Sequence, residues 1–394
     1  MSNIVLSAAV RQNLLSLQST ADLLSTTQNR LATGKKVNTA LDNPTNYFTA
    51  QGLDNRASDI NNLLDSIGNG VQVLQAANTG ITSLQKLVDT AKSIANQVLQ
   101  APTGYSTKST ATSAANAGAV DTNLLGGTGI AATDTLTIAA TGGGTATNIT
   151  FGAGAGQVDT LAELNAALAA NNLLASIDNV TGKITLTTSN DAASSTIGAI
   201  AGTAAAAGKA FNAVAGSAPV VDAASQTIRS NLVGQYNNII TQITTTAQDA
   251  SFNGINLLNG DDLKLTFNET GKSTLNIKGV TYSAGGLGLA SLISGTDFLD
   301  NNSAKSILTK LGSASDTLRS EASTLGSNLS VVQIRQDFNK NLINVLQTGS
   351  ANLTLADTNE EAANSQALST RQSIAVSALA LANQSQQSVL KLLQ

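Results

Sequence analysis

Residues 372–390 read QSIAVSALALANQSQQSVL, and none of these side chains is charged. Apolar and small residues recur here in alternating four- and three-residue steps, at Ile374, Ala378, Leu381, Ser385, Ser388 and Leu392. That spacing predicts an α-helix with a narrow apolar seam. An ordinary amphipathic helix of a globular domain would explain the seam, but its exposed back would normally carry Lys and Glu. The missing charge instead favours a helix that is surrounded by other helices.

The other end of the chain carries the same heptad spacing. A helix predicted from about Leu6 to Leu31 places a seam at Val10, Leu14, Leu17, Ala21, Leu24, Gln28 and Leu31. We expect the two end helices to pair seam to seam, with Leu381 and Leu392 packed against Val10, Leu14 and Leu17. The amides of Gln384, Gln386 and Gln387 would then face neighbouring copies. The predicted assembly seam is Val10, Leu14, Leu17, Leu24, Leu31, Ile374, Ala378, Leu381 and Leu392.

The composition excludes most kinds of chemistry. The chain has 394 residues and a net charge of −4, and only 12% of its residues are charged, about half the usual share. It contains no Cys and no His, which excludes disulfides, thiolate nucleophiles and imidazole bases. We therefore expect no catalytic, cofactor-binding or metal-binding residues, and the charge balance gives no basic patch for nucleic acid. Such a chain suits a polymer subunit that buries its surface against copies of itself.

Two further observations bear on membranes and secretion. Residues 1–10 lack the basic and long apolar regions of a secretory signal peptide. The uncharged stretch 372–390 holds too many amide and hydroxyl side chains to insert into a membrane. These features fit an intracellular protein, or one that is exported without a cleaved signal.

The chain divides into six predicted segments. Residues 1–42 form the first helix, which Gly34 ends, and a polar connector. Residues 43–101 form a long rod helix, capped by Asn43 with Pro44 at its first position. Residues 220–301 hold another rod helix and a β-hairpin, residues 302–356 a C-terminal rod helix, and residues 357–394 the last helix.

Pro102 and Pro219 bracket the remaining segment, 102–219, which is rich in Gly, Ala and Thr. Strands are expected at 134–139 and 148–151, and a hairpin at 175–180 and 183–188. Between the strands and the hairpin, Thr160 and Glu163 predict a capping box at the start of a short helix. The predicted fold class is mainly α, with long antiparallel coiled-coil-like helical rods, paired terminal helices, a β-hairpin element and a small α+β insert domain.

Four motifs, in this order along the chain, resemble those of bacterial flagellin. The first is NRLATGKKVN at 29–38, and the second is the pair of Asn69-Gly70 and Thr79-Gly80. SFNGINLL at 251–258 resembles the flagellin Phe-Asn-Gly hairpin entry, and ANQ at 382–384 followed by SVLKLLQ at 388–394 resembles the family's ending. The resemblance covers about two-thirds of the chain. The family-motif residues are Asn29, Arg30, Gly34, Asn38, Phe252, Asn253, Gly254, Asn383 and Gln384.

The resemblance implies a structural subunit that self-assembles into the bacterial flagellar filament for motility. It implies export by the flagellar type III apparatus with an export chaperone, contact with the hook-associated junction and cap proteins, and an extracellular location. A hook–filament junction protein shares the end helices and remains an alternative. An adhesin or enzyme carried on the insert is the second alternative, for which only scattered carboxylates are available: Asp134, Asp159, Glu163 and Asp178.

Animals have an innate receptor that reads the first rod of flagellins. The recognised forms carry two Arg in this stretch, where this chain has Lys86 and Val88, followed by Asp89. Lysine lacks the planar, bidentate fork of arginine. The resemblance therefore places possible receptor-facing residues at Lys86 and Asp89 but implies weak recognition, and an ordinary solvated helix face is the simpler interpretation.

Overall fold

The computed structural model describes residues 8–126 and 129–392, with only the backbone for 386 and 389–392. The chain forms two compact units, residues 1–71, 264–275 and 331–394 in the first, and residues 72–263 and 276–330 in the second. Two long helices, α2 (Pro44–Gln100) and α5 (Asn301–Thr354), contribute residues to both units. The predicted fold class, long helices with small β-sheets in the middle of the chain, is confirmed.

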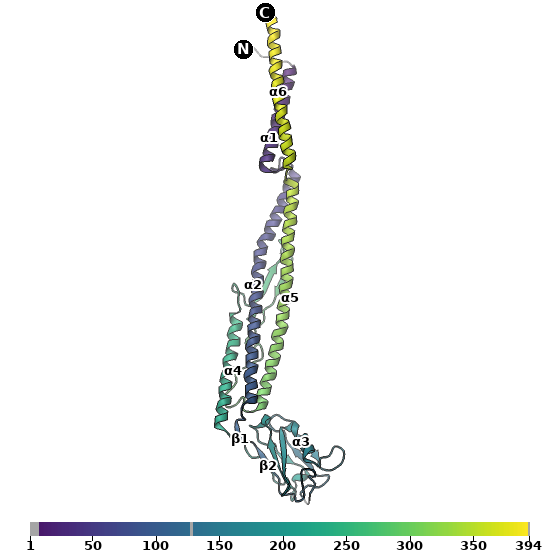
Figure 1. Ribbon diagram of the computed structural model, residues 1–394, viewed down its shortest axis with the longest axis vertical. Coiled ribbons are helices and arrows are strands. Elements are labelled where there is room, and N and C mark those ends of the chain that lie inside the picture. The colour runs from purple at the N-terminus through teal and green to yellow at the C-terminus, as the bar shows by residue number, and fades with distance from the viewer. Residues whose placement is uncertain (1–7, 127–128, 393–394) are drawn as a thin grey trace. The chain divides into compact units, whose positions relative to one another are not determined.

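The first unit contains the terminal helices α1 (Ala8–Thr33) and α6 (Thr358–Leu392), which lie side by side (Figure 1). Its apolar cluster joins α2 to α5 through Ala57, Ile60, Ile343 and Leu346. Strands β9 (Leu263–Thr266) and β10 (Thr274–Ile277) form a two-stranded sheet. The Phe267 carbonyl accepts a hydrogen bond of 3.0 Å from the buried Asn339 amide of α5.

The long helices of the second unit are the last part of α2, α4 (Ala223–Asp249) and the first part of α5. The buried positions of α2 include two consecutive three-residue steps, at which the alternating four- and three-residue spacing slips; these positions are Val71, Leu74, Ala77, Ile81, Leu84 and Val88. Gly80 allows α2 to approach the end of α4 closely, since a Cβ on Gly80 would lie 2.6 Å from the Cβ of Ala250, the residue after α4. Helix α5 runs antiparallel to α2. Gln85 of α2 donates a hydrogen bond to Ser315 of α5, and the later residue Val98 of α2 shares the Arg229 guanidinium with the earlier residue Asn301 of α5.

The insert contains more strands than its sequence predicts. Its two three-stranded sheets have the orders β2-β6-β5 and β4-β3-β7, and a ribbon of β1 and β8 ties its two ends together. Helix α3 (Leu161–Leu168) begins with the predicted capping box of Thr160 and Glu163. The strands are β1 (Tyr105–Thr107), β2 (Thr110–Thr112), β3 (Thr135–Ile138), β4 (Thr147–Thr150), β5 (Leu173–Asp178), β6 (Lys183–Thr188), β7 (Ile200–Ala201) and β8 (Val220–Val221). Short 3₁₀ turns occupy Ala169–Asn171, Asn190–Ala192 and Thr203–Ala205.

The insert has a core of its own. Leu136, Phe151, Leu164, Ile184 and Phe211 are almost completely buried in one apolar cluster. The strands that the sequence did not predict, β1, β2, β7 and β8, are two or three residues long. Strands of this length are too short to show an alternating pattern, and only their pairing with distant partners defines them.

Candidate assembly surface

The terminal helices are joined at one end by an ion pair. Arg30 Nη1 of α1 lies 3.2 Å from Glu361 Oε1 of α6, and Glu361 is almost buried. Towards the other end, Asn13, Ser16 and Thr20 of α1 line a shallow hollow with Arg371, Ile374 and Ala375 of α6. The pairing of the two terminal helices is therefore antiparallel.

A polar connector continues this pairing beyond α1. Gly34 has a φ of +66°, a conformation that favours glycine, and its carbonyl accepts the Ala356 N–H at 3.0 Å. The Lys36 N–H donates to the Thr354 carbonyl at 2.7 Å. The Asn38 side-chain amide donates to the Lys35 carbonyl. The backbone of Gly34 and Lys36 thus holds the connector against the end of α5.

Burial shows which face of each terminal helix points at its partner. On α6 the buried or half-buried positions are Glu361, Ser365, Leu368, Gln372, Ala375, Leu379 and Ala382. On α1 the buried or half-buried set includes Val10, Asn13, Leu17, Thr20, Leu24 and Thr27. Each set follows four- and three-residue steps, so the pair is coiled-coil-like, but about half of the inner positions are polar.

The predicted C-terminal seam is therefore wrong as an intrachain contact. Ile374 is 63% exposed, Leu381 is 69% exposed, and Ala378 between them is exposed as well. The inner face lies one residue further along, which turns the helix by about 100°. Ala375 and Ala382 are half-buried on the inner face, whereas the side chains of Ile374 and Leu381 are mostly exposed, although Ile374 still borders the hollow shared with α1.

The predicted seam residues of α1 differ in burial. Val10 is buried and Leu17 and Leu24 are half-buried, but Leu14 and Leu31 are 37% and 39% exposed. The side chain of Leu392 lies outside the described residues. Asn383 and Gln384 are exposed on α6.

The result is a helix pair that presents apolar side chains to its surroundings. The large hydrophobic residues exposed on it are Leu14, Leu15, Leu23, Leu31, Ile374, Val376 and Leu381. The predicted seam of α6 thus exists as an outward stripe, Ile374, Ala378 and Leu381, followed by exposed Ser385 and Ser388. An uncharged apolar stripe of this kind is typical of an interaction surface.

The Phe-Asn-Gly motif forms a tight turn after α4. Phe252 and Ile255 exchange two backbone hydrogen bonds, and the residues between them, Asn253 and Gly254, have φ values of 51° and 80°. Two consecutive positive φ angles explain the Asn-Gly pair. Two residues later, the buried Asn256 amide donates to the Ala247 and Gln248 carbonyls and so caps α4.

The two possible receptor-facing residues lie on α2. Lys86 and Asp89 are exposed, and Asp89 lies 3.8 Å from Lys92. Lys86 lines a mainly apolar hollow of about 300 Å³ with Leu318 and Arg319 of α5, among others. This arrangement places Lys86 on a solvated helix face without defining a partner.

The carboxylates of the insert have structural partners. Asp134 forms an ion pair of 2.9 Å with Lys209, and Asp178 accepts the Thr181 hydroxyl at 2.6 Å. Backbone N–H groups of Asp159 and Thr160 hold the pKa of Glu163 below its usual value. Among the described residues no group of acidic side chains is arranged to hold a metal ion. No described helix combines enough length and hydropathy to cross a membrane.

Two family models match the ends of the chain. The bacterial flagellin N-terminal helical region matches residues 4–125, and the bacterial flagellin C-terminal helical region matches residues 308–393. This chain belongs to the bacterial flagellin family.

Curated flagellins show the same similarity. Flagellin FljM of Caulobacter vibrioides is 33% identical over 163 residues, which cover 41% of this chain and 58% of that protein. Flagellin FljK of the same organism is 33% identical over 164 residues, with the same coverage. Flagellin A of Rhizobium meliloti is 35% identical over 122 residues, covering 31% of this chain and 27% of that protein. The flagellin described here thus spans 58% of the length of the Caulobacter relatives.

Sequence patterns missed one buried cation of this flagellin. Arg229 on α4 is 1% exposed, and it donates to the Pro102 and Phe298 carbonyls at 2.9 Å and 2.8 Å. The preceding residue, Ile228, is 46% exposed, so the charged side chain and not its apolar neighbour lies on the buried face. A charged residue among apolar neighbours, with no acidic residue nearby in sequence, is a weak signal that only the tertiary structure interprets.

Proposed function

We propose that the chain is a structural subunit that self-assembles into the flagellar filament. The supporting observation is the outward apolar stripe of the terminal helix pair. Its residues Ile374 and Leu381 are more than half exposed, and the helix has no charged side chain between 372 and 390 to keep this face in water. Covering such a surface with copies of the chain removes apolar area from water, which lowers the free energy of the system. The family membership supports the same function.

The finer parts of this proposal concern transport and partners. The subunit would be exported by the flagellar type III apparatus with the help of a chaperone, and would act outside the cell. Hook-associated junction and cap proteins would contact the two ends of the polymer. Family membership supports these partners in general terms, and abundance separates a filament subunit from a junction protein, because only the former dominates sheared surface material.

Seeded polymerisation tests the role of the stripe. Leu381→Asp should abolish growth onto wild-type seeds, because each new contact would have to bury a carboxylate without a partner. Since Leu381 is 69% exposed, the substitution should leave the far-ultraviolet circular dichroism of the subunit unchanged.

The matched control is Gln387→Ala, which changes an exposed polar residue of the same helix and should grow at nearly the wild-type rate. Light scattering follows both variants. Normal growth of Leu381→Asp subunits would show that the outward stripe of α6 is not the assembly surface.

A further inference from the structure

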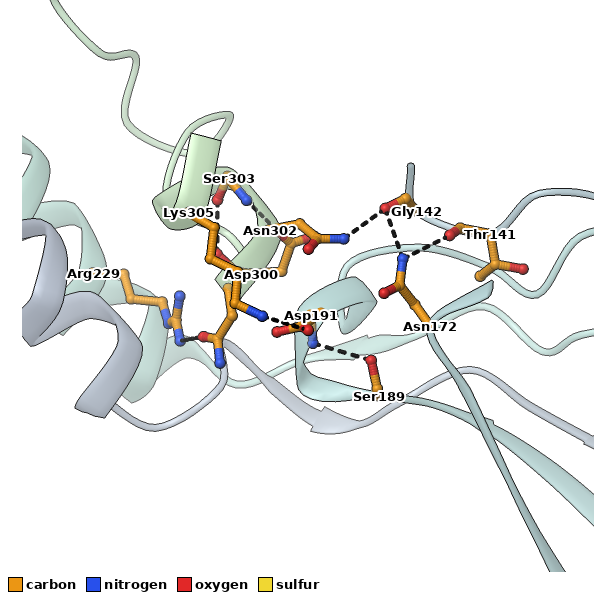
Figure 2. A network of polar contacts seen from close by, with 11 residues as sticks. Thr141, Gly142, Asn172, Ser189, Asp191, Arg229, Asp300, Asn302, Ser303 and Lys305 are labelled. Atoms are coloured by element: carbon orange, nitrogen blue, oxygen red, sulfur yellow. Dashed lines mark hydrogen bonds and ion pairs between the residues drawn. The ribbon is translucent and has the colours of Figure 1, made fainter. Parts of the chain in front are cut away.

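The first turn of α5 carries three polar contacts to the insert, although the two segments are far apart in sequence. Asp300, which precedes α5, accepts the Ser194 hydroxyl at 2.6 Å. The Asn302 amide donates to the Gly142 carbonyl at 2.9 Å, and Lys305 Nζ lies 2.6 Å from Asp191 Oδ2. Figure 2 shows Asn302 and Lys305 directed towards these insert groups.

The residues of this contact are held in place from both sides. The second oxygen of Asp300 accepts the Ser303 N–H at 3.0 Å and so caps α5. On the insert, the Asn172 amide donates to the Thr141 and Gly142 carbonyls, and Ser189 Oγ accepts the Asp191 N–H (Figure 2). Asp300 is only 8% exposed. The Asp300 and Asn302 contacts are therefore supported by further hydrogen bonds on both sides, whereas the Lys305 side chain is 53% exposed.

A second set of hydrogen bonds, all donated by Arg229, joins the start of the insert to the start of α5. Arg229 of α4 donates to the Pro102 carbonyl, where the insert begins, and to the Phe298 carbonyl, just before α5. It also reaches Asn301 Oδ1, the first residue of α5, at 3.4 Å. The β1–β8 ribbon pairs Tyr105 with Val221, so the chain enters and leaves the insert at one place. The insert thus has both a short double tether and a separate lateral contact.

We propose that the first turn of α5 is a latch that holds the insert in one orientation on the helices of the second unit. A domain held only by its tether would rotate about the β1–β8 ribbon. The latch contacts lie outside that ribbon and would prevent the insert from rotating about it. The latch residues are Ser194 and Asp191 of the insert and Asn302 and Lys305 of α5. Any partner of the insert would therefore meet it in a single fixed presentation. This inference concerns the subunit alone and does not rest on polymerisation.

Spin-label distances in the monomer test the latch. The chain has no Cys, so Val180→Cys on the insert, where Val180 is 91% exposed, and Thr317→Cys on α5 provide a unique pair of labels. Double electron–electron resonance should give one narrow distance peak for this pair. In the background of Ser194→Ala, Asn302→Ala and Lys305→Ala the narrow peak should be lost. A broad distribution in the parent, or an unchanged narrow peak in the triple variant, would overturn the proposal.

Matched controls separate the latch from general damage to α5. Ser306→Ala with Lys310→Ala alters exposed residues of the same part of the helix without touching an insert contact, and its peak should stay narrow. Lys305→Asp alone should broaden the distribution, and adding Asp191→Lys should restore the narrow peak, because the reversed pair attracts equally. Failure of this charge swap to restore the peak would count against the Lys305–Asp191 contact as part of the latch.

Discussion

Removing the Arg229 guanidinium should destabilise the second unit more than any surface substitution. Its two shortest bonds, 2.8 Å to Phe298 and 2.9 Å to Pro102, would be lost, and the remaining bonds of 3.3–3.4 Å are weaker. Hydrogen bonds to a charged group contribute about 1.5–3 kcal/mol each. Relief from desolvation of the cation offsets several kcal/mol of that sum. We therefore expect Arg229→Met to cost about 2–4 kcal/mol of unfolding free energy.

The physical state of Arg229 supports this estimate. Burial lowers the pKa of its guanidinium, while the neighbouring Asp300 and Tyr105 raise it. The group nevertheless stays charged at neutral pH, since arginine does not deprotonate in proteins. The carbonyls of Val98 and Ala101 belong to the end of α2, where the helix dipole favours a cation. Lysine keeps the charge but cannot reach several carbonyls at once, so Arg229→Lys should be nearly as costly.

Thermal unfolding followed by circular dichroism is the assay. A loss of about 2–4 kcal/mol corresponds to a fall in Tm of about 5–15 °C for a unit of this size. The control is Arg319→Met, because the Arg319 side chain is 68% exposed and pairs with Asp316 at 3.4 Å on the same helix surface. Such a pair contributes about 1 kcal/mol at most. Equal Tm values for Arg229→Met and Arg319→Met would refute the reasoning.

Two further predictions concern glycines and acid. Gly80→Ala should lower the free energy of unfolding by about 1–3 kcal/mol, because its Cβ would lie 2.6 Å from Leu258 Cδ1. Gly68→Ala would meet nothing within 4 Å and should raise it by about 1 kcal/mol. Chemical denaturation measures both changes. The Thr39 and Asn38 N–H groups hold the pKa of Asp42 below its ordinary 3.8. Its stabilising contribution is therefore complete above pH 3.8 and is lost as the pH falls through the lower folded pKa. The protection of the two N–H groups from hydrogen exchange, measured relative to the intrinsic rate at each pH, should fall there, and Asp42→Asn should remove this dependence.

Much of the helical framework could be predicted from local pattern. The capping residues Asn43 and Thr160 mark helix starts because their side chains accept backbone N–H groups only a few residues away. In α5, Leu311, Ala314 and Leu318 are buried and follow a three- and four-residue spacing that can be found from the sequence, since one strong apolar repeat leaves a single choice of face. The two-residue strands β7 and β8 could not be found, because their pairing depends on partners far along the chain.

The sequence by itself determined that this chain is mainly helical, that it carries flagellin motifs in order, and that its terminal helices carry heptad repeats. It did not determine which face of α6 points at α1. Ile374 and Ala375, and likewise Leu381 and Ala382, are neighbouring residues that define two seams separated by about 100°. Only the tertiary structure decided between them, because Ala375 and Ala382 are half-buried on the inner face of the helix pair while Ile374 and Leu381 are more than half exposed. This exposed stripe is the surface that we propose for assembly.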